Sequence, residues 1–164
     1  MIAEMIASLV SVHGLHVDNG DVFIIAQKII SKAEGRKRKL GDVNPTKKAE
    51  KLAEITGKDA RFVELVLNES NKVIRARQNT LIVEHKKGFI CANAGIDHSN
   101  LTKSETDNVD EVLLLPEDPD ESARKIQMTL ERCFHKKVGV SIIDSHGRAW
   151  RNGTVGITIG IAGI

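Results

Sequence analysis

Residues 20–36 read GDVFIIAQKIISKAEGR, and this stretch decides the fold. Its apolar part, Val22 to Ala26, has the length and the β-branched content of a buried strand. From Gln27 onward a polar and basic set replaces the apolar residues, and Gly35 then interrupts the pattern. The residues after the strand therefore differ in chemistry from the strand itself, which is typical of a site at a strand end.

The segments on either side alternate between helix-like and strand-like patterns. Helices are predicted from Ile2 to near Gly14, from an Asn44-Pro45 start to Gly57, from an Asp59 cap to Ser70, and from an Asp118-Pro119 start through Phe134. Short strands are predicted over 73–77, 81–85, 88–92, 112–115 and 138–143, with a long polar loop over 93–110. This order predicts an α/β (mixed α+β) fold, with a mixed sheet and flanking helices, in a single domain over residues 1–164.

The composition excludes several classes of protein. Lys and Arg number 24 against 22 Asp and Glu, and aromatic residues make up only 3%, so neither a nucleic-acid binder nor a base-stacking surface is indicated. Cys91 and Cys133 lie far apart without metal-ligand spacing, so two reduced, buried thiols are expected. No apolar run is long enough to cross a bilayer and no secretion signal opens the chain, so a cytoplasmic protein is expected.

Two aspartates stand in comparable places. Asp97 follows an apolar strand and a glycine-containing turn, and Asp144 directly follows the predicted strand over 138–143. Ligands of open α/β sheets bind beyond the carboxyl ends of strands, where carboxylates hold hard cations that bridge phosphate oxygens. Magnesium or manganese would suit such a pair. Taken singly, each aspartate is more often a cap or a turn residue, and sequence spacing alone does not decide between these interpretations.

Cationic side chains follow the same strands. Lys28 and Lys32 lie just beyond the first buried strand, where ammonium groups could reach nucleotide phosphates, although solvated lysines are the commoner arrangement. The segment from Arg148 to Gly153 holds two arginines, an amide and the only Trp of the chain. It is either an anion-binding loop or a surface loop fixed by its Trp.

Other candidate motifs carry less information. The basic run from Arg36 to Lys39 is expected to be an exposed hairpin, because no aromatic residue or amphipathic helix accompanies it. His85, His98 and His146 form no metal-binding pair and are expected to be exposed. The chain also lacks the GxxxxGK[ST] and GxGxxG motifs, so any nucleotide is bound without these glycine-rich loops.

Four ordered blocks of this sequence resemble the coenzyme F420-0:L-glutamate ligases, also called F420 gamma-glutamyl ligases, and the likeness extends from Asn19 to the last residue. The blocks are GDVFIIAQKIISKAEGR at 20–36, GFICANAGIDHSN at 88–100, VLLLPEDPDESA at 112–123 and DSHGRAWRNGTVGITIGIAGI at 144–164. The resemblance implies a GTP-dependent acid–amino-acid ligase of class EC 6.3.2. Such an enzyme adds L-glutamate by gamma-glutamyl linkage to coenzyme F420-0 through an acyl-phosphate intermediate.

The same resemblance implies cofactors, partners and site residues. Two divalent cations, Mg²⁺ or Mn²⁺, and a K⁺ ion assist in the family, whose members pair as homodimers. It implies metal ligands at Asp97, Asp144 and Ser145, and nucleotide contacts at Gln27, Lys28, Lys32 and Asn100. Ser145 replaces the commoner Thr and still offers a hydroxyl oxygen. No catalytic side chain is assigned, because phosphoryl transfer depends chiefly on positioning and charge neutralisation.

Family members usually begin with a Pro-containing loop and continue past Ile164, so we expect this chain to be truncated at both ends relative to them. Three alternatives therefore stay open beside the ligase. The first is a nucleotide- and metal-binding fragment without turnover, and the second is a dimerisation partner for a complete homologue. The third is a small nucleic-acid-binding module that uses the basic run from Arg36 to Lys39, with binding that weakens steeply with salt.

Overall fold

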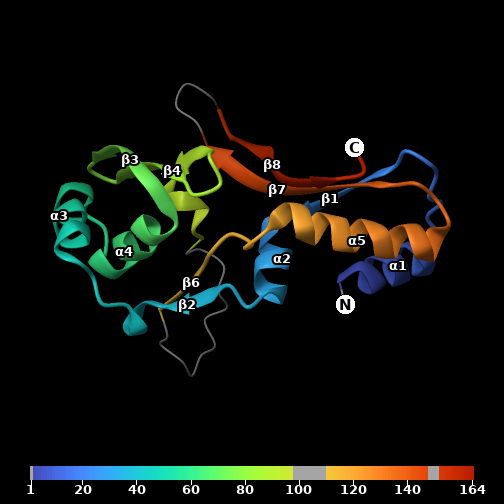
Figure 1. Cartoon of the computed structure of the whole chain (residues 1–164), viewed down its shortest axis with the longest axis horizontal. Helices are drawn as coiled ribbons and strands as arrows, with labels where there is room; N and C mark the ends of the chain where they lie inside the picture. Colours follow the sequence, from blue (N-terminus) through green and yellow to red (C-terminus); the bar gives the residue numbers. More distant parts are fainter. Residues whose placement is uncertain (1, 98–109, 148–151) are drawn as a thin grey trace. The chain divides into compact units, whose positions relative to one another are not determined.

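The computed structural model describes residues 2–97, 110–147 and 152–164 of the chain (Figure 1). The single domain predicted from the sequence consists of two compact units. Unit 1 comprises residues 1–36 and 115–164, and unit 2 comprises residues 37–114. The mixed α/β class is confirmed, since helices and both parallel and antiparallel strand pairs are present. Within the described residues, no helix has the length and apolar character needed to cross a membrane.

Unit 1 is a three-stranded sheet with helices on one face. The strands β1 (Val22–Ala26), β7 (Gly139–Gly147) and β8 (Thr154–Ala162) lie in the order β1-β7-β8, with β1 parallel to β7 and β8 antiparallel to it. Helix α5 (Pro119–Phe134) packs against β7 and β8 of this sheet, and helix α1 (Ile2–Val12) packs against α5 (Figure 1). Leu130, Val140 and Ile142 are fully buried between the two layers. Burial of this apolar surface is what holds the unit together.

The start of α5 forms as the sequence predicts. Pro119 occupies the first turn, and the Asp118 carboxylate accepts a 2.9 Å hydrogen bond from the backbone N–H of Glu121. An N-cap carboxylate satisfies a backbone donor that has no partner within the helix, and proline at the first turn has no donor to lose. This helix start therefore anchors the layer of unit 1 that covers its sheet.

One helix of unit 1 is absent from the sequence prediction. α2 (Gln27–Ala33) begins at the residue after β1, with Ala26 as its extended N-cap residue and no intervening loop. Ile30 is buried in the core of unit 1, while the N-terminal residue Gln27 is also buried despite its polarity. The polar set that follows the strand is thus placed on a short helix whose first turn continues directly from β1.

Unit 2 pairs two helices with an antiparallel meander. Its helices are α3 (Lys47–Thr56) and α4 (Ala60–Asn68), and its meander is β3 (Ser70–Arg77), β4 (Thr80–His85) and β5 (Ile90–Ala92). Val63, Val66 and Val83 are fully buried in its core. The predicted meander and the predicted Asp59 cap of α4 are both confirmed, since Asp59 accepts from the backbone N–H of Arg61 at 2.8 Å.

Two predictions for unit 2 need correction. Thr46, not Asn44, caps α3, and its hydroxyl accepts a 3.3 Å hydrogen bond from the backbone N–H of Ala49. The expected basic hairpin is instead a short strand, β2 (Lys37–Lys39), which pairs antiparallel with β6 (Glu111–Leu113). The pairing partner lies more than seventy positions away in the sequence, so no local turn signal could have indicated it. The β2 side chains are exposed, as predicted.

Candidate functional site

Asp144 lies inside strand β7. The sequence predicts that the strand ends at Ile143, but β7 continues to Gly147, and Asp144 lies opposite Ile157 of β8. The register of β7 against β8 shifts between Ile142 and Ile143. Such an irregularity changes the direction in which the following side chains point. Asp144 is 9% exposed, so its carboxylate is buried enough to need polar partners.

Polar side chains approach the Asp144 carboxylate on both of its oxygens. The Gln27 side-chain amide donates from Nε2 to Oδ1 over 3.5 Å, and the Nε2 atom of His146 lies 3.0 Å from Oδ2. The Ser31 hydroxyl donates to Oε1 of Gln27 over 2.8 Å. Gln27 and Ser31 are 2% and 0% exposed, so water does not replace these contacts. The four side chains form a buried polar cluster, and we refer to Gln27, Ser31, Asp144 and His146 as the Asp144 cluster.

Helix α2 presents two neighbouring stripes of polar residues. Gln27 and Ser31 are four residues apart and both point into the Asp144 cluster. Lys28 and Lys32 have the same spacing and are each displaced by one residue, about 100° around the helix. Lys28 is half-buried and Lys32 is exposed. The helix therefore holds a carboxylate with one stripe and carries two cationic side chains on the adjacent one.

Ser145 faces away from the Asp144 cluster. Successive side chains of a strand point to opposite faces of the sheet, and Ser145 is exposed where Asp144 is buried. It lies opposite Gly156 of β8, which has no side chain to cover it. The two adjacent oxygen donors therefore serve opposite faces, an arrangement that suits contributions to different ions better than joint coordination of one ion.

Asp97 belongs to unit 2 and follows a turn with an unusual backbone. Asn93, Ala94 and Gly95 have φ angles of 52°, 53° and 67°. Left-handed conformations are costly for residues other than glycine, and such strain is concentrated at functional sites. The backbone N–H and C=O of Asp97 then exchange two 2.9 Å hydrogen bonds with Leu113. The half-buried Asp97 is thus fixed through its main chain.

Asp97 borders a cavity of about 350 Å³ within unit 2. The lining includes apolar and charged groups, namely Leu40, Lys58, Asp59, Phe62, Asn93, Ile96, Asp97 and Asp110. Arg61 lies beside two of these carboxylates, at 2.5 Å from Asp59 and 3.9 Å from Asp110. Its hydrogen bond to Asp59 is the main cause that lowers the pKa of that carboxyl below 3.8. Asp97 thus shares this cavity with the two carboxylates that lie beside Arg61.

The predicted site residues are distributed over both units. Gln27, Lys28, Lys32, Asp144 and Ser145 belong to unit 1, and Asp97 belongs to unit 2. The expected convergence of Asp97 and Asp144 on one cation stays a prediction. Asn100, His98 and the segment 148–151 lie outside the described residues.

Sequence reasoning missed two members of the Asp144 cluster. His146 was expected to be exposed, yet its side chain is only 11% exposed and touches Asp144; His85 is likewise buried, at 1%. The missed signal is the alternation of a strand, which places His146 on the same face as Asp144 two residues earlier. Ser31 could have been found from its helical spacing to Gln27. The expected pair of buried thiols is half right, since Cys91 is buried and Cys133 is exposed.

The donor chemistry of these residues fits a hard divalent cation. Carboxylate and hydroxyl oxygens are preferred ligands of Mg²⁺ and Mn²⁺. Among the described residues, no group of three His, Cys, Asp or Glu is arranged to hold a metal by itself. A cation at Asp144 would therefore need further oxygen ligands from a nucleotide, from water or from other parts of the protein.

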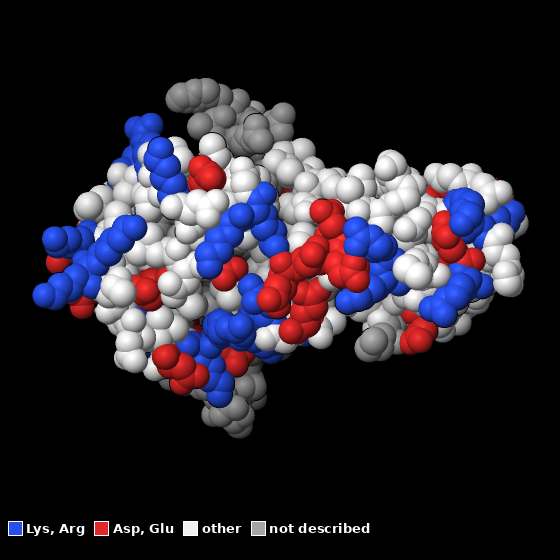
Figure 2. Space-filling model, viewed as in Figure 1, with Lys and Arg blue, Asp and Glu red and all other residues white. Residues whose placement is uncertain are grey.

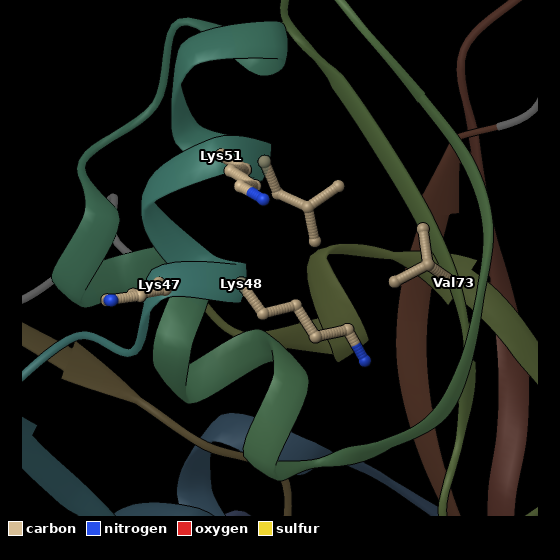
Figure 3. Close-up of a pocket in the computed structure, with 5 residues that line it drawn as sticks. Lys47, Lys48, Lys51 and Val73 are labelled. Atoms are coloured by element: carbon tan, nitrogen blue, oxygen red, sulfur yellow. The ribbon is translucent and has the colours of Figure 1, made fainter.

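A second cavity, of about 360 Å³, contains none of the predicted site residues. Lys47, Lys48, Lys51 and Leu52 of α3 line it together with Val73 of β3. Figure 3 shows Lys48 extending on the side of Val73, whereas Lys47 points away from it. Acidic and basic side chains are interspersed over the face of the described residues in Figure 2. On this face, the described residues form no continuous basic surface of the kind that the nucleic-acid alternative would require.

Comparison with known proteins identifies the family. The sequence model of the F420-0:Gamma-glutamyl ligase family matches residues 1–164. The chain is 43% identical over 148 residues to the coenzyme F420:L-glutamate ligase of Methanocaldococcus jannaschii. The aligned region covers 90% of this chain and 57% of that protein. The proteins of the same name from Methanothermobacter thermautotrophicus and Archaeoglobus fulgidus are each 42% identical, over 99% of this chain and 62% and 61% of their own lengths.

The chain thus spans about three fifths of the length of these relatives. The match nevertheless runs over the whole chain and includes the four blocks that carry the resemblance. The chain therefore belongs to the F420-0:gamma-glutamyl ligase family.

Proposed function

We propose that this chain is the nucleotide- and cation-holding part of a ligase that joins L-glutamate to coenzyme F420-0. The relatives bear the name coenzyme F420:L-glutamate ligase, and the chain shares about two fifths of its residues with them. The observation that carries the proposal is the buried Asp144 carboxylate, to which Gln27 donates on one oxygen while His146 lies 3.0 Å from the other, beside the lysines of α2. Ordered oxygen ligands next to ammonium groups suit a cation-bound triphosphate.

The proposed reaction uses GTP to activate a carboxylate. A carboxylate oxygen of the acceptor takes the terminal phosphoryl group of GTP, which gives an acyl phosphate and GDP. The glutamate amine then attacks the acyl carbon, and an amide forms as inorganic phosphate leaves and the amine loses a proton. Mg²⁺ or Mn²⁺ would neutralise charge on the phosphate oxygens during the first step. Asp144 and Asp97 are each proposed to be a ligand of a divalent cation, and Ser145 is proposed to contribute to another ion on the face of β7 opposite to Asp144.

The remaining roles follow from position. Lys28 and Lys32 are proposed to contact nucleotide phosphates from α2, and Asn100 is proposed to contact the nucleotide. K⁺ is proposed as an additional ion, as in the resemblance that the sequence carries. A homodimer is also proposed, and the exposed apolar residues Val22 and Ile24 of β1 support an interface there, because they are 45% and 66% exposed.

Calorimetry and a product assay on the same protein test this proposal. The full chain is titrated with GTP in the presence and absence of MnCl₂, then incubated with coenzyme F420-0, glutamate and either KCl or NaCl. We expect GTP to bind only weakly without Mn²⁺, and mass spectrometry to show the acceptor carrying an added glutamate residue. Sedimentation at several concentrations measures the proposed dimer.

The outcomes separate the ligase from its alternatives. Cation-dependent GTP binding without any glutamylated product would favour a nucleotide-binding piece that lacks turnover. Absence of both binding and product, in a protein shown to be folded, would refute the proposed site. The lysine variants Lys28→Met and Lys32→Met should each weaken GTP binding by about tenfold, since one charge-assisted hydrogen bond contributes roughly 1.5 kcal/mol.

A further inference from the structure

Gln27 is among the most buried polar residues of unit 1, although the family resemblance of the sequence implies a nucleotide contact at this position. It is 2% exposed, whereas its neighbour Lys28 is half-buried and Lys32 is exposed. A side chain with so little accessible surface is poorly placed to receive a ligand group from solution. Its polar atoms instead have protein partners, which are Ser31 and Asp144.

The direction of the Gln27 amide is fixed by Ser31. The Ser31 hydroxyl is fully buried and donates to Oε1 of Gln27 at 2.8 Å. An amide whose oxygen accepts this bond must present its NH₂ group elsewhere, and that group reaches Oδ1 of Asp144 at 3.5 Å. A flipped amide would direct its NH₂ group at Ser31 and its oxygen at the Asp144 carboxylate, where two acceptors would face each other. Ser31 therefore selects the orientation in which Gln27 donates to Asp144.

The carboxylate is held from its other side as well. Nε2 of His146 lies 3.0 Å from Oδ2, and both side chains are nearly buried, at 11% and 12% exposed. Gln27 on one oxygen and His146 beside the other restrict the plane of the carboxylate. The Gln27 contact is at the long end of the hydrogen-bond range, so its role is better described as orientation than as strong stabilisation.

We propose that Gln27 is a positioning residue that orients the Asp144 carboxylate for a divalent cation, with Ser31 fixing its amide. This inference rests on the proposed function, because it takes Asp144 as a cation ligand. It assigns Gln27 to the cation side of the site, while Lys28 and Lys32 on the adjacent stripe of α2 serve the nucleotide. Residues that orient a metal ligand commonly contribute a factor of about 10 to 100 in metal affinity.

The test measures Mn²⁺ and GTP affinities separately in the full chain. Mn²⁺ binding is followed by the loss of the free-ion electron paramagnetic resonance signal, and GTP binding is followed by calorimetry in the presence of a chelator. For Gln27→Met we expect Mn²⁺ affinity to fall by about tenfold or more, while GTP affinity without the cation stays within twofold. Ile29→Ala changes a half-exposed residue of the same helix and is the matched control, with both affinities unchanged.

Ser31→Ala distinguishes orientation from a general weakening of the fold. It leaves Asp144 and Gln27 in place, so we expect a loss of about threefold in Mn²⁺ affinity that disappears when Gln27 is already Met. Thermal unfolding of each variant verifies that it is folded. An additive loss in the double variant would mean that Ser31 does not act through Gln27, and would overturn the proposed relay.

The remaining outcomes are also decisive. If Gln27→Met leaves Mn²⁺ affinity within twofold of the parent chain, the positioning role is wrong, although the proposed function stands. If the same variant weakens cation-free GTP binding, Gln27 is a nucleotide contact instead. If the parent chain is folded but binds no Mn²⁺, the proposed cation site is wrong. The positioning role of Gln27 is then wrong as well, because it depends on that site.

Discussion

Asp144 and Asp97 reach comparable chemistry by opposite structural means. Asp144 belongs to a paired strand, and side chains from α2 and from its own strand hold its carboxylate. Asp97 follows a turn of left-handed residues, and main-chain bonds to Leu113 fix its position beside an open cavity. In the case of Asp144, strand pairing fixes the backbone and neighbouring side chains orient the carboxylate. In the second case the backbone itself stores strain to direct the residue.

The largest effect is expected from Asp144→Asn. Replacing a ligand should reduce Mn²⁺ affinity by more than the roughly 100-fold upper limit for residues that only orient a ligand. The new NH₂ group would also replace one of the two carboxylate oxygens that Gln27 and His146 approach, so the free energy of unfolding should fall by about 1–3 kcal/mol. Metal titration and urea unfolding measure the two effects, and a loss of affinity with unchanged stability would show that the Asp144 cluster does not restrain the carboxylate.

The strained turn before Asp97 offers the second prediction. Ala94 is fully buried and has a φ of 53°, where a β-branched side chain is especially unfavourable. Ala94→Val should therefore destabilise unit 2 by about 2–4 kcal/mol through strain and overpacking. Ala94→Gly is the control and should stay within about 1 kcal/mol, because lost strain offsets the lost methyl group. Hydrogen exchange should localise the effect of valine to α4 and β4, and equal effects of both variants would exclude strain at this turn.

Asp97→Asn sharpens the contrast with Asp144. We expect Mn²⁺ affinity to fall by tenfold or more, but the free energy of unfolding to change by less than about 1 kcal/mol, because the main-chain bonds to Leu113 are kept. The measurements are the same titration and urea unfolding used for Asp144. A large loss of stability would mean that the Asp97 carboxylate supports the fold as much as the Asp144 carboxylate does.

The smallest effect concerns pH and the Asp97 cavity. Asp59 has its folded pKa lowered below 3.8, mainly by the hydrogen bond from Arg61, so its stabilising contribution is complete above that value. The contribution is lost as pH falls through the lower folded pKa. Asp59→Asn keeps an N-cap acceptor but does not titrate, so it should reduce the acid sensitivity of unfolding by less than about 1 kcal/mol between roughly pH 5 and pH 2. Urea midpoints at the two pH values provide the measurement, and an unchanged acid sensitivity would contradict the assignment.

Local sequence signals predicted most of the helices and strands. The features that depend on pairing between distant segments could not be predicted in this way. Asp118 with Pro119 located α5, and Gly57 located the end of α3 with a φ of 67°, because caps and left-handed glycines act within a few residues. α2 was missed because Gln27 to Ala33 is short and begins with no side-chain cap. The extension of β7 to Gly147 was missed for a different reason, since it depends on pairing with β8 rather than on apolar residues of its own.

The candidate site divides in the same way. Asp97 and Asp144 could be named because they follow apolar strands, but the partners of Asp144 depend on how α2 packs against β7. Gln27 is separated from Asp144 by 117 positions, so no local pattern connects their side chains. Strand alternation could have placed His146 on the same face as Asp144. It was not applied there, because the strand was predicted to end at Ile143, whereas β7 continues to Gly147.

The direct passage from β1 into α2 ties the rotational phase of the helix to the register of the strand. Ala26 is the last residue of the strand and Gln27 is the first residue of the helix, so no loop between them can accommodate a change in length. One deleted residue at this junction would turn every following side chain by about 100°, which would carry the amide of Gln27 away from Asp144 and put Lys28 in the place of Gln27. Substitutions in this segment can be tolerated one by one, whereas a change of spacing alters every contact of α2 at once.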